Sequence, residues 1–352
     1  MAKLDKFLKL LLEHGGSDLH LGVGQPLRYR VNGELEVYDN NRYSEVAVRL
    51  AMQEICPADR WEEFLAKKDL DFAYAAEGLG RFRTNFYVDA KGMGAVLRYI
   101  PTKIRTLQEL NLPDSLMDLC KVKSGLVLIT GPTGSGKTTT LAAMIDYINH
   151  HTSKHIITIE EPIEFIHKNH KSFIEHCEIG VHSPSFPLAL RSAMREDPDI
   201  ILLGEMRDPE SIRAGLSCAA MGVLVFSTLH TNNAPKTIDR LIDAFPVQEQ
   251  PQIRTLLAES LRGIASQILC RRKQGGRVAA HEVLLWVEGL PNSIRSGQVS
   301  NIRTLIEANK ALGMRTMDSS LQELMLAGVI SAEEAYMKAS DKKLFQDYIA
   351  FS

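Results

Sequence analysis

The sequence predicts an α/β fold: a parallel sheet covered by helices on both faces, with a smaller α+β domain before it and a helical portion after it. In the middle of the 352-residue chain, short apolar runs alternate with helical stretches, a pattern typical of parallel strands buried on both faces. The first hundred residues instead alternate apolar and polar side chains around turn signals. The length favours two domains, because single cores stop growing near about 250–300 residues.

Residues 1–100 predict the smaller α+β domain. Apolar residues between Leu4 and Leu12 recur at helical spacing, and a glycine pair follows them. Alternation before Asn32-Gly33 predicts a hairpin, because this dipeptide favours a tight turn. A second hairpin is expected from residues 82–88, whose Phe, Thr, Phe and Val share one face, with a return strand over residues 95–100.

Residues 101–113 begin and end in proline and predict a linker, so that the larger domain spans residues 114–352. From about residue 289 the pattern becomes helical, with apolar stripes that include Leu321, Leu324, Met325 and Ala335. Four buried strands are expected before that point: Leu126–Thr130, Ile156–Glu160, Ile200–Leu203 and Val223–Leu229.

Composition excludes several classes of protein. The net charge of −2 argues against bulk nucleic-acid binding, and the basic triplet Arg271-Arg272-Lys273 is interpreted as a solvated turn. No apolar run reaches the ~18 residues of a spanning helix, and the start lacks a secretory pattern, so a cytoplasmic protein is expected. No two of the five cysteines lie within four residues, which excludes a CxxC pair or a zinc ribbon built from adjacent ligands.

The strongest signal is a phosphate-binding loop. Residues 131–138, Gly-Pro-Thr-Gly-Ser-Gly-Lys-Thr, fit GxxxxGK[ST] at every fixed position, between an apolar strand and a helical stripe. Glycines let backbone N–H groups surround phosphate oxygens, Lys137 supplies a charge for the β- and γ-phosphates, and the Thr138 hydroxyl is a Mg²⁺ ligand. ATP and Mg²⁺ are therefore expected, with a nucleotide-binding set of Gly131, Thr133, Gly134, Ser135, Gly136, Lys137, Thr138 and Thr139.

Two acidic segments follow predicted strands, where open α/β sheets place their ligands. The first carries Glu160, Glu161 and Glu164, three carboxylates that repel one another unless a cation or solvent intervenes. The alternative for this segment is a solvated turn.

In the second acidic segment, four apolar residues ending in Gly204-Glu205 match a Walker B strand, whose acid engages Mg²⁺ directly or through water. Its alternative is an ordinary buried strand followed by an exposed glutamate. Metal candidates are thus Thr138, Glu160 and Glu205, and Asp208-Pro209 predicts the start of the next helix.

Residues 227–232, Ser-Thr-Leu-His-Thr-Asn, group hydrogen-bonding side chains at the end of another predicted strand. His230 is a candidate contact for the γ-phosphate. The competing interpretation is a structural histidine whose hydrogen bonds are satisfied, which is common at such positions.

These motifs, in this order, resemble the secretion ATPase superfamily and within it the type IV pilus retraction ATPases (the PilT/PilU family). The resemblance runs nearly end to end. It rests on Ser17–Leu21, Gly80–Arg83 and Leu97-Arg98 in the first domain, and on the Walker A loop, the Asp box at 158–164, the Walker B segment at 197–208 and the His box at 227–240 in the second.

The resemblance implies a homohexamer with a PAS-like N-terminal domain and a RecA-like ATPase domain. It implies that Arg83 and Arg98 act on the γ-phosphate, with Arg81 as a weaker third candidate. It also implies that Glu164 positions or activates water and that the Glu205 carboxylate binds Mg²⁺. Implied partners are an inner-membrane pilus platform protein and a paralogous retraction ATPase, with the chain peripheral at the inner membrane. No nucleic-acid partner is expected.

The sequence departs from the family pattern at several places. Glu161 replaces the usual Asp, and Val223 stands where relatives carry one of two histidines. The stretch Ser293–Gln298 keeps only part of a retraction-linked motif, and the tetracysteine of assembly ATPases is absent. The resemblance as a whole implies a motor ATPase for pilus retraction. The departures motivate an alternative, a nucleotide-binding accessory subunit that hydrolyses ATP weakly. A weaker alternative is a DNA translocase.

Overall fold

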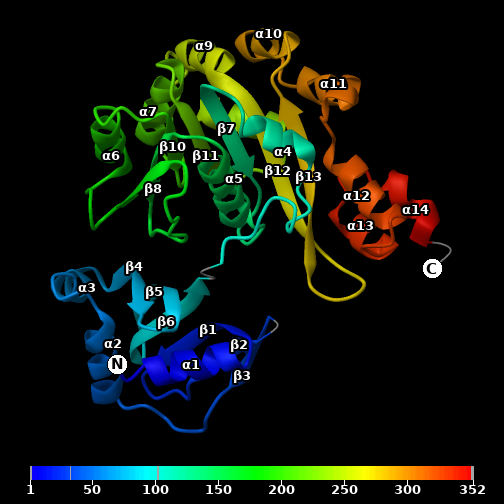
Figure 1. Cartoon of the computed structure of the whole chain (residues 1–352). Coiled ribbons are helices and arrows are strands. Elements are labelled where there is room, and N and C mark those ends of the chain that lie inside the picture. Colours follow the sequence, from blue (N-terminus) through cyan, green and yellow to red (C-terminus); the bar gives the residue numbers. More distant parts are fainter. Residues whose placement is uncertain (1, 32, 101–102, 350–352) are drawn as a thin grey trace. The chain divides into compact units, whose positions relative to one another are not determined.

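The computed structural model of the chain describes residues 2–31, 33–100 and 103–349, which form two compact units (Figure 1). The first unit is Met1–Lys103 with Glu161–Ile166, and the second is Ile104–Glu160 with His167–Ser352. Asn32 of the expected turn and the first two residues of the expected linker, 101–102, lie outside the described residues. No helix in the described part of the chain combines the length and the apolar character needed to cross a membrane.

The first unit holds a six-stranded antiparallel sheet in the order β3-β2-β1-β6-β5-β4. Both expected hairpins are present, as β2–β3 and β5–β6, and the second return strand begins at Gly92, three residues earlier than expected. The strands are β1 Gly16–Gly22, β2 Arg28–Val31, β3 Glu34–Val37, β4 Asp69–Ala76, β5 Gly80–Asp89 and β6 Gly92–Ile100. The helices are α1 Asp5–Glu13, α2 Glu45–Ile55 and α3 Trp61–Lys67.

The core of this unit follows from strand periodicity. On β5, Phe82, Thr84 and Phe86 are buried, while the side chains between them are partly exposed. Phe86 meets Phe72 of β4 edge to face, with ring centroids 5.0 Å apart. The leucines of α1 complete this core, which confirms the expected amphipathic helix.

The second unit is built on a seven-stranded sheet in the order β13-β12-β7-β11-β10-β8-β9. All neighbours are parallel except β12 and β13, an antiparallel hairpin at one edge. The strands are β7 Gly125–Thr130, β8 His155–Glu160, β9 Phe173–Glu178, β10 Ile200–Leu203, β11 Leu224–Leu229, β12 Leu261–Arg271 and β13 Arg277–Leu285. The four expected strands are confirmed within one residue at each end, whereas β9, β12 and β13 were not predicted.

Helices cover both faces of this sheet, as the apolar runs predicted. Alternate residues of each central strand enter different cores: Leu126 and Leu128 of β7 face α6–α9, while Val127 and Ile129 face α4 and α5. The helices are α4 Asp114–Leu119, α5 Lys137–His151, α6 Phe186–Ala193, α7 Pro209–Ala220, α8 Ala234–Asp243, α9 Gln250–Ser260, α10 Gly289–Arg295 and α11 Asn301–Ala308.

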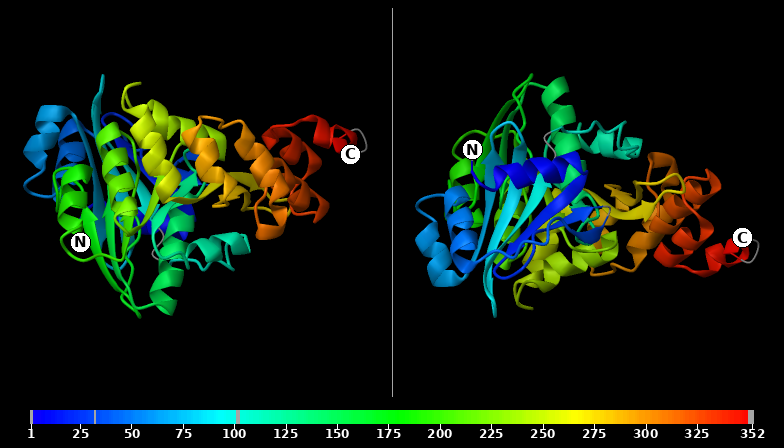
Figure 2. Two further views of the ribbon diagram at one scale, coloured as in Figure 1. Left: turned by 90° about the horizontal axis from the view of Figure 1, so that it is seen from above. Right: turned by 90° about the horizontal axis from the view of Figure 1, so that it is seen from below.

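The C-terminal helices form a separate small core against the β12–β13 hairpin. They are α12 Met317–Leu326, α13 Ala332–Lys338 and α14 Lys343–Ile349, preceded by a 3₁₀ turn at Lys310–Leu312. Leu321, Met325 and Ala335 pack there with Cys270 and Ala280 of the hairpin, which confirms the expected helical stripes. Both views in Figure 2 show these helices gathered at one end of the unit.

The buried histidine of β13 makes stability depend on pH. Burial, followed by the nearby Arg315 charge, lowers the pKa of His281 from 6.5 to about 4. Since the unfolded chain takes up this proton at higher pH, the stability held by neutral His281 is present above about pH 6.5 and is lost as the pH falls toward 4. His167, whose burial lowers its pKa to about 3, adds to the same trend.

We therefore expect the melting temperature to fall between pH 6.5 and 4, and to fall less steeply in His281→Gln. Differential scanning fluorimetry across this range measures both slopes. His14→Gln, at an exposed position just after α1, is the matched control and keeps the original slope. Equal slopes in the wild type and His281→Gln would contradict the prediction.

Candidate functional site

The glycine-rich loop lies between the end of β7 and the start of α5, as predicted. Gly131 has φ 148° and Gly136 has φ 87°, both in the region that favours glycine. A Cβ atom on Gly131 would lie 2.2 Å from the backbone oxygen of Gln267, so no larger residue fits. The glycines are thus required both for the turn and for close packing against β12.

Gln267 of β12 holds the loop in place, a role that the sequence did not reveal. Its Oε1 accepts a hydrogen bond from the Thr140 hydroxyl at 2.9 Å, and its Nε2 donates to the backbone oxygen of Ser135 at 2.6 Å. The side chain is fully buried. No local signal could have found this residue, because it belongs to an unpredicted strand far along the chain.

The loop presents hydrogen-bond donors suited to an anion. Nζ of Lys137 donates to the backbone oxygens of Gly131 at 2.9 Å and Pro132 at 3.2 Å, within the loop itself. The Ser135 hydroxyl is buried and has no hydrogen-bond partner among the described residues. A buried polar atom without a partner costs free energy, so a bound phosphate oxygen at this place would relieve that cost.

The two expected acids lie at the ends of neighbouring parallel strands. Glu160 is the last residue of β8, and Glu205 follows β10 by two residues. The strands are in register, and the Gly204 N–H donates to the Ile159 oxygen at 2.8 Å. Glu160 is 6% exposed and the Glu205 side chain 18%. Both carboxylates therefore belong to the same edge of the sheet, sheltered from bulk water.

His230 lies between the loop lysine and the Walker B acid. Its Nε2 is 3.2 Å from Oε1 of Glu205, and its Nδ1 is 3.4 Å from Nζ of Lys137. Nε of Arg207 contacts the other Glu205 oxygen at 2.8 Å. The sequence left a structural role for His230 open. In the structure both of its ring nitrogens contact charged residues of the site, Lys137 and Glu205.

The oxygen atoms of this cluster suit a hard divalent cation. Thr138 lies in the first turn of α5 and offers a hydroxyl oxygen. The carboxylates of Glu160 and Glu205 offer oxygen atoms of the kind that Mg²⁺ prefers. A cavity of about 690 Å³ continues from Pro132–Ser135 along β12 and β13 to α13, within the size range of small-ligand sites. The second unit thus offers a loop suited to an anion, two carboxylates at neighbouring strand ends and space for a larger ligand.

The two expected arginines of the first unit are direct neighbours across β5 and β6. Arg83 pairs in register with Arg98, and each guanidinium has an acidic partner. Nη2 of Arg83 contacts Asp71 at 2.5 Å, and Nε of Arg98 contacts the buried Asp18 at 2.6 Å. The hydrogen bonds to Asp71 raise the pKa of Arg83. Within the same unit, Arg83 also lies 4.0 Å from Glu164.

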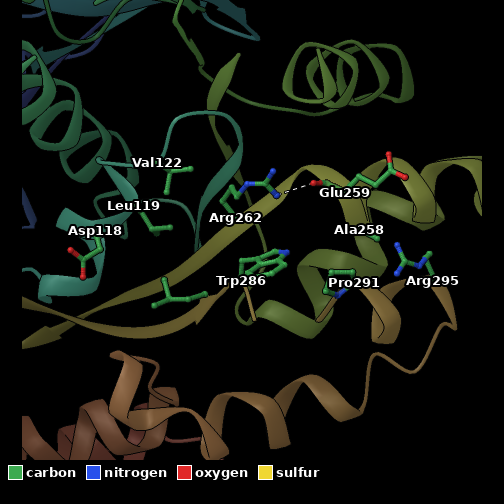
Figure 3. Close-up of a pocket in the computed structure, with 10 residues that line it drawn as sticks. Asp118, Leu119, Val122, Ala258, Glu259, Arg262, Trp286, Pro291 and Arg295 are labelled. Carbon is green, nitrogen blue, oxygen red and sulfur yellow. Dashed lines mark hydrogen bonds between the residues drawn. The ribbon is translucent and has the colours of Figure 1, made fainter. Parts of the chain in front are cut away.

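Two of the departures from the family pattern, Val223 and the stretch 293–298, belong to the second unit. Val223 is buried just before β11, in the apolar core. Ser293 and Ile294 are buried on α10, and Arg295 lines a hollow of about 730 Å³ with the half-exposed Trp286 (Figure 3). Arg262, which donates to the Glu259 backbone oxygen at 2.8 Å, lines the same hollow. The divergent stretch thus borders a mixed apolar and charged surface.

Together, the sheet topology, the glycine loop and the acids at the strand ends define a P-loop nucleotide-binding protein with a RecA-like α/β core. The chain belongs to the type II/IV secretion system protein family, which matches residues 2–336.

Among similar proteins, the type IV pilus retraction ATPase PilT of Pseudomonas aeruginosa is 43% identical over 96% of this chain and 98% of its own length. The type IV pilus ATPase PilU of the same organism is 37% identical over 96% of this chain and 88% of its own length. A crystal structure of the pilus retraction motor PilT with bound ADP superimposes with a TM-score of 0.89, at 40% identity, covering 99% of this chain and all of that one.

Proposed function

We propose that this chain is a motor ATPase that hydrolyses ATP to power type IV pilus retraction, and with it twitching motility. The observation that carries the proposal is the 43% identity to a pilus retraction ATPase over nearly the whole of both chains. The contacts among Lys137, His230 and Glu205 support it, because they gather the groups that a P-loop ATPase needs around one loop.

In this proposal the loop amides and the nucleotide-binding residues 131 and 133–139 hold the phosphates of ATP. Lys137 exchanges its two backbone acceptors for β- and γ-phosphate oxygens. Thr138, Glu160 and Glu205 would hold Mg²⁺, which would neutralise phosphate charge. His230 contacts the γ-phosphate and couples its presence to Glu205 and Lys137.

Glu164 positions or activates a water molecule, which forms a bond to the γ-phosphorus as the bond to the leaving ADP oxygen breaks. Arg83 and Arg98 stabilise the charge that develops on the transferred group. Their cross-strand pairing supports this role, because two adjacent guanidinium groups can converge on one anion. Asp71 and Asp18 offset the repulsion between the two arginines until the anion is bound.

We further propose a homohexamer in which residues 1–100 form a mobile PAS-like domain, 101–113 a linker and 114–352 the ATPase domain. The ring would work at the cytoplasmic face of the inner membrane on a pilus platform protein, together with a paralogous retraction ATPase. Mounting the arginines on a mobile domain would couple domain closure to hydrolysis.

The Walker B acid provides the test of this site. Glu205→Gln keeps the shape of the side chain but removes its negative charge. We therefore expect kcat to fall about 10- to 100-fold and the Mg²⁺ concentration needed for half-maximal activity to rise. Steady-state phosphate release by the purified oligomer, titrated with Mg²⁺, measures both. Glu210→Gln, an exposed acid on α7, is the control and keeps wild-type turnover. Wild-type kinetics in Glu205→Gln would show that Glu205 has no part in hydrolysis or in Mg²⁺ binding.

An accessory role beside another pilus motor is the second candidate, favoured by Val223 and by the divergent stretch 293–298. The lower identity to PilU, 37% against 43%, makes it the less supported one. Turnover by the isolated oligomer discriminates between them: robust hydrolysis supports the motor, whereas nucleotide binding with negligible hydrolysis supports the accessory subunit.

A further inference from the structure

A cluster of metal-ligating side chains lies on α5 and on the loop before β9, apart from the proposed nucleotide site. One carboxylate oxygen of Asp146 and one nitrogen each of His150 and His170 lie within 4.8 Å of one another. The two imidazole rings are stacked, with centroids 3.9 Å apart. Asp146 is partly buried and both histidines are exposed. None of the three has a part in the proposed hydrolysis.

The spacing of these residues suits chelation. Asp146 and His150 are four residues apart on α5, which places them on the same helix face one turn apart. His170 comes from the loop before β9 and closes the group from outside the helix. The region is rich in such ligands, since seven of the chain's 11 histidines lie between residues 150 and 182: His150, His151, His155, His167, His170, His176 and His182.

Asn149 holds the loop of His170 against the helix. Its buried Oδ1 accepts a hydrogen bond from the His170 N–H at 3.0 Å, and its Nδ2 donates to the Lys168 oxygen at 2.7 Å. Its backbone oxygen accepts from the Lys171 N–H at 2.9 Å. Three hydrogen bonds from one buried residue fix the loop, so His170 is positioned beside His150 before any ion binds.

The ligand chemistry points to a transition metal rather than to Mg²⁺. Two imidazoles and one carboxylate form the kind of set that binds Zn²⁺ with three protein ligands and a water molecule. Nδ1 of His150 bonds to the Asp146 backbone oxygen at 2.8 Å. The same Nδ1 also lies 3.4 Å from Oδ2 of the Asp146 carboxylate, so one imidazole nitrogen already stands beside a carboxylate oxygen.

The remaining adjustment is small. Ligand atoms around a tetrahedral Zn²⁺ lie about 3.4 Å apart. The three ligand atoms here lie within 4.8 Å of one another, so the side chains have to close only slightly around an ion. Both histidine side chains are exposed, so they have room to move. Lys168 and Lys171 flank His170, but both are exposed, and solvent and salt screen their charges.

We propose that Asp146, His150 and His170 form a binding site for a Zn²⁺-class divalent transition metal, which ties α5 to the loop before β9. Because an ion bound only to the folded state stabilises it, saturating Zn²⁺ raises the melting temperature of the protein. Protons compete for the same imidazole nitrogens, so binding weakens as the pH falls.

The test is calorimetric titration of Zn²⁺, and of Co²⁺ as a spectroscopic probe, into the chelator-treated full-length protein. The titration is done in excess Mg²⁺ and without nucleotide, so that cation sites made only of oxygen ligands are already filled. We expect one ion per chain, with affinity at least about 10-fold weaker in His150→Ala and in His170→Ala. Asp146→Asn weakens binding in the same direction. The thermal shift with Zn²⁺ shrinks in parallel, and neither readout depends on ATP hydrolysis.

His151→Ala is the matched control. His151 is an exposed neighbour whose Nδ1 bonds to the Tyr147 oxygen in the same way, but the residue four positions before it is a tyrosine instead of an acid. The variant keeps wild-type affinity if the proposal holds. Unchanged Zn²⁺ binding in both His150→Ala and His170→Ala, an equal loss in His151→Ala, or no binding by a folded wild-type protein would each overturn it.

Discussion

Replacing Lys137 with alanine is expected to lower kcat/KM for ATP hydrolysis by about 10²- to 10³-fold, the usual effect of removing one preorganised group that stabilises developing charge. The Lys137 ammonium is buried among the loop carbonyls and lies 3.4 Å from His230. Its removal deprives the phosphates of a point charge in a sheltered site, where such a charge has its largest effect. Phosphate release and fluorescent-nucleotide binding measure the loss.

The control for this variant is Lys121→Ala, because Lys121 is an exposed lysine of the same unit whose ion pair with Asp118 lies on the surface. It is expected to keep wild-type turnover. In cells, Lys137→Ala should abolish twitching motility and alter surface piliation. Normal motility, with no paralogue compensating, would refute the proposed motor role, and wild-type hydrolysis in vitro would refute the proposed phosphate-binding role of Lys137.

The largest effect is expected at Arg83. Replacement by alanine should lower kcat by about 10³- to 10⁵-fold, as for other arginines that act on a transferred phosphoryl group. ATP affinity should change much less, because the loop that binds the phosphates is intact. Arg83→Lys should not restore activity, since an ammonium cannot reproduce the planar guanidinium fork. A full steady-state analysis separates kcat from KM.

Two control variants test whether the loss of activity in Arg83→Ala comes only from a structural role of Arg83. Arg49→Ala, an exposed arginine on α2 of the same unit, should keep wild-type kinetics. Asp71→Ala removes the partner of Arg83 without removing the arginine, so it should retain far more activity than Arg83→Ala. If Arg83→Ala and Asp71→Ala lost activity equally, Arg83 would serve mainly to hold its own strand.

Much of the fold could be predicted from the sequence because its signals are local. The helix stripe after the loop, the four apolar strands and the Asp208 cap of α7, whose side chain accepts from the Ser211 N–H, all lie within a few residues of the motifs that predict them. The strands that were missed carry weaker local patterns. β9 is a polar edge strand, and the long β12 contains Gly263, where a Cβ would collide with Leu119.

The candidate site was predictable only in its parts. Lys137, Glu205 and His230 each follow a recognisable strand, but their spacing in the sequence does not tell which of them meet. Gln267 carried no signal of a role in the site, and Arg207 was recognised only as part of the Walker B segment, with no contact predicted for it. Nor did the sequence show that Arg83 and Arg98 face each other across two strands with Asp71 and Asp18 as their partners.

By itself, the sequence determined the phosphate-binding loop and the class of sheet that carries it, because glycine conformation, apolar periodicity and helix caps act over a few residues. Only the tertiary structure decided that β12 runs beside β7 and places Gln267 under the loop, that His230 bridges Lys137 and Glu205, and that His170 lies against His150. The physical reason is that these contacts join residues distant in the chain, so they depend on strand order and loop packing, which no local pattern encodes.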